Sequence, residues 1–272
     1  MILIFLLMIG LAVGSFLNVV VYRTNHPEKL KVKGKIRKFG GRSFCPQCRK
    51  KIVWYDNLPL LSYLLLKGKC RQCRSSISGQ YPVVELLTAL AFGGAFLFFG
   101  LPQGIGEWFS LGYHLVIVAA FLVIIVSDLL YLTIPDEALV VSGVAALVFW
   151  GFSALFQAEP LLFFIPLTAG LGAMAMFWLL HWLTKGKGMG FGDVKLAGLM
   201  GLVLGWPKII LALYLAFLTG AFFGVILILS RKKKFGQVVP FGPFLVFGTL
   251  ISLFFGEKLW QVVVMVLLSS SF

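Results

Sequence analysis

Hydrophobic side chains are gathered along this chain into runs of about 20 residues, and shorter polar stretches separate the runs. A run of that length is what an α-helix needs to cross a bilayer. The pattern therefore predicts an all-α polytopic membrane protein with about eight transmembrane helices. They are expected at 2–22, 82–100, 111–131, 136–156, 161–184, 193–206, 208–230 and 238–256.

The composition agrees with a membrane protein. Of 272 residues, 60% are hydrophobic and only 12% are charged, and a soluble domain carries about twice that share of charge. The first run lacks the basic start and the small-residue cleavage site of a signal peptide, so we expect it to be retained as a helix. Residues 257–272 are too few for a comfortable span and too apolar for a free tail.

The Lys and Arg residues predict the orientation of the helices. If 23–81 lies inside the cell and the helices alternate from there, only Lys208 and Lys258 of the 24 basic residues fall outside. The positive-inside rule describes this bias. The net charge of +14 thus encodes topology, and no nucleic-acid partner is expected. Anionic lipid is expected to attract the loop, chiefly through Lys29, Lys31, Lys33 and Lys35.

The one sizeable segment outside the membrane holds all four cysteines, as Cys45/Cys48 and Cys70/Cys73 with 21 residues between the pairs. Two C-x-x-C turns supply the four thiolates of a closed, structural zinc site. A disulfide or a redox pair is the alternative, which a cytoplasmic loop disfavours. The expected organisation is a first helix, a cytoplasmic zinc-binding loop domain and a transmembrane bundle, over 1–22, 23–81 and 82–272.

Asp128 is the acidic residue that is hardest to explain structurally. It lies near the end of a predicted helix, where the helix dipole disfavours a carboxylate, and an ionisable group inside a span is costly. No capping role explains it, and a buried pair with Lys195 is the main structural alternative. Asp136 and Glu137, by contrast, follow Pro135 at a helix start, where acids are ordinary.

Asp193 lies in the turn GMGFGDVKL at 188–196, and an N-cap role for it stays open. The predicted topology places Asp193 and Asp128 at the same membrane face on different helices. Two carboxyls held close share a proton, and such a pair cleaves peptide bonds in aspartic proteases. Gly190 and Gly192 would let a substrate strand approach the backbone.

These residues together resemble the type IV prepilin peptidase family. The Gly-x-Gly-Asp motif at 190–193 is accompanied, in order, by matching stretches along most of the chain. They are GSFLNVVVYR at 14–23, WYDNLPLLSYLLLKGKCRQC at 54–73, ISGQYPVVELLT at 77–88 and VVPFGPFL at 238–245. One departure is Ser127, where the family usually has an apolar residue.

The resemblance implies an aspartic endopeptidase of the bacterial inner membrane that removes basic leader peptides from prepilins and pseudopilins. It implies Asp128 and Asp193 as catalytic, with Gly190, Gly192 and Lys195 as supporting motif residues. It further implies N-methylation of the new amino terminus with S-adenosylmethionine, and Glu85 as a candidate cofactor-binding residue.

Other functions stay open at this point. Intramembrane acids also serve ion- or proton-coupled transporters, although those sites lie near mid-bilayer. A peptidase that lacks methylase activity, a presenilin-like protease for other membrane proteins, and a membrane-anchored zinc module that recruits partners are the remaining alternatives.

Overall fold

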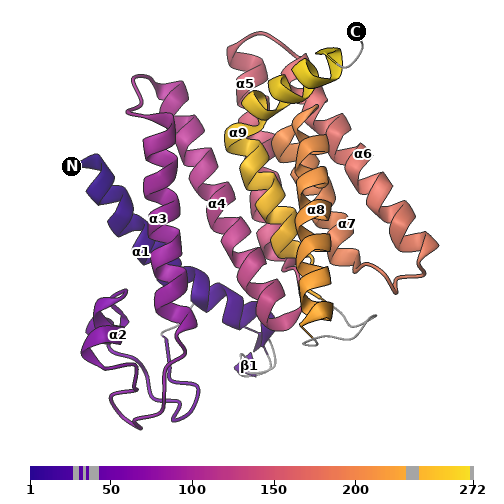
Figure 1. Ribbon diagram of the computed structural model, residues 1–272. Helices are drawn as coiled ribbons and strands as arrows, with labels where there is room; N and C mark the ends of the chain where they lie inside the picture. Colours follow the sequence, from indigo (N-terminus) through magenta and orange to yellow (C-terminus); the bar gives the residue numbers. More distant parts are fainter. Residues whose placement is uncertain (27–30, 33–34, 37–42, 231–238, 270–272) are drawn as a thin grey trace. The chain divides into compact units, whose positions relative to one another are not determined.

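The computed structural model describes residues 1–26, 31–32, 35–36, 43–230 and 239–269. Helices dominate this part of the chain, and its strands form one small hairpin (Figure 1). The elements are α1 (Ile2–Asn25), β1 (Lys31–Val32), β2 (Lys35–Ile36), η2 (Trp54–Asn57), α2 (Leu61–Leu65), α3 (Gln80–Phe99), α4 (Ile105–Tyr131), α5 (Asp136–Phe156), α6 (Leu161–Leu183), α7 (Phe191–Leu204), α8 (Lys208–Leu229) and α9 (Gly242–Ser269).

The expectation of an all-α multi-pass membrane protein is confirmed. Within the described ranges, α1, α3, α4, α5, α6, α8 and α9 are long and apolar enough to cross a membrane. The helix expected at 193–206 corresponds to α7, which is too short to be counted with them. It has 14 residues and so extends about 21 Å, less than the ~30 Å of a hydrocarbon core. Helix α9 continues to Ser269, so most of 257–272 belongs to a helix.

The chain divides into two compact units, Met1–Val123 and Ile124–Phe272, which are described separately. The sequence-based division into 1–22, 23–81 and 82–272 stays a prediction.

Close backbone contact joins α1 to α3 in the first unit. A Cβ atom on Gly10 would lie 2.6 Å from the Cα of Ala89, and one on Gly14 would lie 2.6 Å from the Cα of Glu85. Only glycine permits this approach. Next to the crossing, the side-chain amide of Asn18 donates to the carbonyl of Tyr81 at 3.1 Å. The two ends of the intervening loop are thereby held together.

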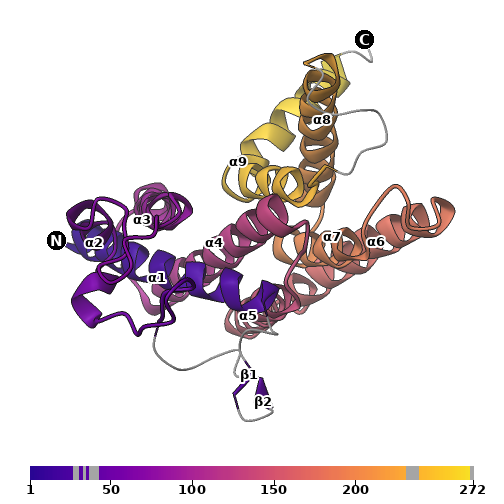
Figure 2. The same cartoon turned by 90° about the horizontal axis from the view of Figure 1, so that it is seen from below.

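Helix α7 is the packing centre of the second unit. Its Val194, Leu196 and Met200 are fully buried, and it packs against α5, α6 and α9. Figure 2 shows the α6–α7 and α8–α9 pairs, each side by side. A Cβ on Gly201 would meet the backbone of α6 at Ala169, so the small residue sets the distance between the two helices. The start of α7, which carries Asp193, is fixed by this packing.

Candidate active site

Asp128 lies in the last turn of α4 and is 6% exposed. Its Oδ2 atom accepts the backbone N–H of Gly242 at 2.8 Å, and Gly242 is the first residue of α9. The N-terminus of a helix carries partial positive charge and free N–H groups. Asp128 therefore has the capping partner that sequence analysis did not find, on a helix 114 residues away along the chain.

Glycine is the only residue that fits position 242. A Cβ atom there would lie 2.7 Å from Oδ2 of Asp128 and 3.2 Å from its Cγ. Sequence analysis did not select Gly242 as a site residue, although it lies within VVPFGPFL, the stretch quoted for the resemblance. The first residue of that stretch, Val238, lies outside the described residues.

Asp193 is the third residue of α7, and Gly190 is the N-cap. The Oδ2 atom of Asp193 accepts the N–H of Gly190 at 3.2 Å, as the acidic residue of a capping box does. Asp193 is therefore not the N-cap, the alternative that the sequence left open, but lies three positions after it. Gly192 lets the start of α7 approach the α4–α5 connection, because a Cβ there would lie 3.2 Å from the Cβ of Ile134.

The fold brings Asp128 and Asp193 together. Asp128 caps the start of α9, which packs against α7, and Gly192, next to Asp193, lies against Ile134, six residues after Asp128. Both acids are thus at one end of the second unit, although 65 positions separate them in the sequence. Two like charges in a partly buried setting resist simultaneous ionisation, so such a pair holds one proton between its members. The arrangement can supply a general base and a general acid at one place.

Lys195 does not pair with Asp128, contrary to the structural alternative raised by the sequence. Its Nζ lies 2.7 Å from Oδ1 of Asp136 at the start of α5, and 5.4 Å from the centroid of the Phe191 ring. Lys195 thus joins α7 to α5 beside the two aspartates. The side chain of Asp136 is 67% exposed, which separates it from the buried Asp128.

His181 supports the segment that leads into α7. Its Nδ1–H donates to the carbonyl of Met189 at 2.8 Å, and its ring packs edge-on against Phe191. Gly186, with φ of +73°, makes the turn between them. His181 thus acts as a packing and hydrogen-bonding side chain of this segment.

The four cysteines of the loop gather at one point. The Sγ atoms of Cys45, Cys48, Cys70 and Cys73 all lie within 4.8 Å of one another. Cys45 and Cys73 are 3.8 Å apart at sulfur, which is the spacing that ~2.3 Å bonds to a tetrahedral metal produce and far above the ~2.05 Å of a disulfide. All four are free thiols, so the residues present fit a metal ion.

The backbone forms the same turn around each cysteine pair. The carbonyl of Cys45 accepts the N–H of Arg49, and the carbonyl of Cys70 accepts the N–H of Arg74, at 2.8 and 3.0 Å. Both arginines adopt positive φ, at 56° and 58°. Each turn directs two sulfurs to the same side, which explains why spacing alone could predict the cluster.

Glu85 is buried on α3 in the first unit, with 6% exposure. Its Oε2 accepts the backbone N–H of Leu60 at 2.8 Å, and the Ser15 side chain also contacts it. The carboxylate is thus already engaged in fixing the loop against α3. Its expected cofactor contact stays a prediction.

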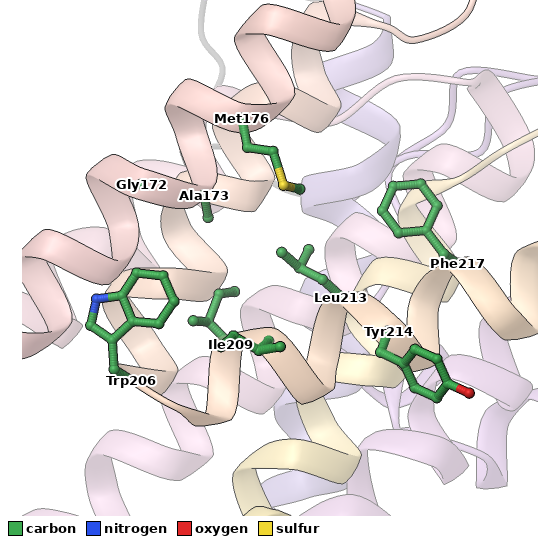
Figure 3. A pocket seen from close by; sticks show the side chains of 9 residues that line it. Gly172, Ala173, Met176, Trp206, Ile209, Leu213, Tyr214 and Phe217 are labelled. Atoms are coloured by element: carbon green, nitrogen blue, oxygen red, sulfur yellow. The ribbon is translucent and has the colours of Figure 1, made fainter.

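An apolar cavity of about 330 Å³ lies between α6 and α8, apart from these acids (Figure 3). Met176, Trp206, Leu213 and Phe217 are among its lining residues. Its lining contains no carboxylate, histidine or lysine, and Tyr214 contributes a hydroxyl group, so the paired aspartates remain the candidate reaction centre.

A multi-pass helical protein that joins two aspartates from different helices has the architecture of an intramembrane aspartic protease. Family models support this class: the bacterial peptidase A24 N-terminal domain matches residues 8–99, and the type IV leader peptidase family matches residues 115–225. The chain belongs to the type IV leader peptidase family.

Curated relatives match this chain over most of its length and of their own. The chain is 35% identical over 275 residues to the prepilin leader peptidase/N-methyltransferase of Aeromonas salmonicida strain A449, covering 92% of this chain and 89% of the relative. It is 33% identical over 271 residues to the protein of that name from Pseudomonas aeruginosa, covering 93% and 90%. No solved structure matches the chain.

Proposed function

We propose that this protein is an intramembrane aspartic endopeptidase that removes basic leader peptides from type IV prepilins and pseudopilins. We place the reaction at the cytoplasmic face of the bacterial inner membrane. The relatives named as prepilin leader peptidases support the substrate class. The observation that carries the chemistry is the placement of Asp128 at the start of α9 and of Asp193 in the first turn of α7, two helices that pack against each other.

In the proposed reaction, the ionised aspartate takes a proton from water, and the resulting hydroxide attacks the scissile carbonyl carbon. The protonated aspartate donates to the carbonyl oxygen, which gives a tetrahedral diol. In the second step, the aspartate that donated its proton takes one back from a diol hydroxyl. The other aspartate gives the proton that it took from water to the leaving nitrogen, and the C–N bond breaks. Gly242 and Gly190 hold the two carboxyls through their N–H groups, so the acids are oriented before substrate arrives.

The loop cysteines are proposed to bind one structural zinc ion. Zinc favours four thiolates in a tetrahedral arrangement, and the Sγ spacing supports it. With all four positions filled by protein, the metal supplies folding energy rather than a catalytic water. The loop is proposed to face the cytoplasm, where reduced thiols persist.

The protein is further proposed to methylate the new amino terminus with S-adenosylmethionine, because the relatives are named N-methyltransferases. That donor would supply an electrophilic methyl group. Glu85 fits a direct role poorly, since its buried carboxylate already accepts the Leu60 N–H. We propose that it acts by positioning the loop.

Anionic lipid is proposed as a second partner of the loop through its lysines. Of those chosen from the sequence, Lys29 and Lys33 lie outside the described residues, and the structure describes only the backbone of Lys31 and Lys35.

The test is product mass after incubating the full chain in liposomes with a prepilin and S-adenosylmethionine. Wild type is expected to yield pilin shortened by its leader and heavier by one methyl group. Asp128→Asn and Asp193→Asn are expected to yield no cleavage, because each removes a titrating carboxyl. Asp136→Asn is the matched control, an exposed acid of the same region that should stay active.

Robust cleavage by either dyad variant would refute the aspartic mechanism. Cleavage by wild type without added mass would identify a peptidase lacking methylase activity. No cleavage of several prepilins would favour a transporter.

A further inference from the structure

The loop between α1 and α3 exposes large apolar side chains over a short stretch. Trp54, Leu64 and Leu65 are 78%, 70% and 79% exposed, and Tyr55, Leu58 and Leu61 are exposed as well. We call these six residues the η2–α2 face. Leu61, Leu64 and Leu65 share one side of α2 through their spacing of three and four. Such a cluster in water is unusual and marks an interaction surface.

The hydrogen bond from Leu60 to Glu85 sets the depth of this face. Glu85 lies five residues after the first residue of α3, so its Cα is about 7.5 Å inward from there. Its side chain reaches Leu60, which therefore lies against the first turns of that helix. Helix α3 is long and apolar enough to span from Gln80, and Figure 1 shows α2 beside its lower end. Amphipathic segments that lie on membranes bury their apolar side about 5–10 Å into the headgroup region.

The net positive charge of the loop that carries this face favours binding to an anionic membrane surface. The loop's described residues from 43 to 79 contain one acid, Asp56, which Arg71 binds at 2.6 Å. Six further basic residues are exposed there, namely Arg49, Lys50, Lys51, Lys67, Lys69 and Arg74. Basic residues next to inserted aromatic and leucine side chains are the usual composition of a segment that binds anionic lipid.

The face is held in shape from both ends. Leu60 adopts φ of +57°, an unfavourable conformation for leucine, and Glu85 fixes it there. At the other end Arg71 donates to both carboxylate oxygens of Asp56 in η2 and lies over the Tyr55 ring at 5.4 Å. A surface ordered in advance loses less entropy when it binds.

We propose that the η2–α2 face is inserted in the headgroup region of an anionic bilayer, beside the membrane entry of α3. The inserted leucines and Trp54 supply the apolar contact, and exposed basic residues of the same loop, with Lys67 and Lys69 directly after α2, select anionic headgroups. This proposal concerns how the loop contacts the membrane and does not depend on the proposed peptidase chemistry. The face should therefore insert to the same extent in the inactive Asp193→Asn protein.

The test places a photoreactive benzoyl-phenylalanine at position 65 of the full chain, and at position 47 as control. Gln47 is exposed on the first cysteine turn and lies outside the apolar face. Both proteins are reconstituted in nanodiscs of phosphatidylglycerol and phosphatidylethanolamine, checked for metal content, irradiated and analysed by mass spectrometry. The same proteins are prepared in pure phosphatidylcholine, and again with the Asp193→Asn substitution.

Position 65 is expected to give several-fold more lipid adduct than position 47, in active and inactive protein alike, and less adduct in phosphatidylcholine. Equal labelling of positions 65 and 47, or no lipid adduct at position 65, would overturn the proposal. So would adducts at position 65 that form with the chain itself or with added prepilin instead of lipid. Equal lipid labelling in phosphatidylcholine would refute the selection of anionic headgroups.

Discussion

Replacing Gly242 with alanine tests whether the start of α9 orients Asp128. The added Cβ would lie 2.7 Å from Oδ2, whereas ordinary contacts of this kind begin near 3.4 Å. The carboxylate or the helix start must therefore move by about 0.7 Å, and the 2.8 Å hydrogen bond from Gly242 is distorted or lost.

The magnitude follows from two independent considerations. A hydrogen bond to a charged group contributes about 1.5–3 kcal/mol, which corresponds to about 10- to 150-fold in rate at 1.36 kcal/mol per tenfold. A misplacement of about 1 Å at a catalytic group costs roughly 100-fold. We expect Gly242→Ala to lower kcat for leader cleavage by about 10- to 100-fold, with a smaller change in KM.

The assay is steady-state cleavage of a prepilin in nanodiscs, with thermal unfolding and metal content measured on the same samples. Gly224→Ala is the matched control, because a Cβ at that glycine of α8 meets nothing within 4 Å, and it should cleave like wild type. If Gly242→Ala kept wild-type kcat while remaining folded, the contact with Asp128 would have no role in orienting the catalytic carboxyl.

Three further predictions concern other parts of the molecule. Purified protein should contain about one zinc per chain, and Cys45→Ser should lower that content and expose the loop to proteolysis; metal-free native protein would contradict the zinc site. Asp136→Asn should reduce stability by at most about 1 kcal/mol, since its pair with Lys195 is exposed, and should leave the cleavage rate near wild type. Glu85→Leu should impair methylation more than cleavage by freeing the Leu60 N–H. Glu85→Gln, which keeps an acceptor, should restore methylation as read by product mass, and a Gln variant as defective as Leu would contradict the positioning role.

Hydrophobic runs predicted the long helices because each run is local and nearly free of charge. The cysteine cluster could be predicted from the sequence equally well. Each C-x-x-C turn determines its own geometry, and only the contact between the two turns is long-range. Helix ends were less certain: α9 starts at Gly242 and continues through 257–269. Glu257, within this continuation, pairs with Lys208 at 2.7 Å, a partner 49 residues away.

Contacts between distant residues explain what the sequence could not predict. Asp128 looked uncapped because its partner, the N–H of Gly242, belongs to another helix. Lys195 could have paired with either Asp128 or Asp136 until the packing of α7 against α5 brought it to Asp136. The apolar side of α2 was missed because five residues are too few to reveal a helical period.

The hydrogen bonds of Asn18 have a consequence for the order in which the first unit assembles. Asn18 donates to Tyr81, 63 residues later, and its amide oxygen accepts from Gln80. At about 5–20 residues per second, the ribosome needs about 3–13 s to reach these partners after Asn18 has been made. During that interval, the hydrogen bond that the structure describes for the Asn18 amide within α1 is the one to the carbonyl of Gly14. The hydrogen bonds of Asn18 are therefore complete only once the start of α3 has been made, so α1 and α3 depend on each other across the cysteine-bearing loop.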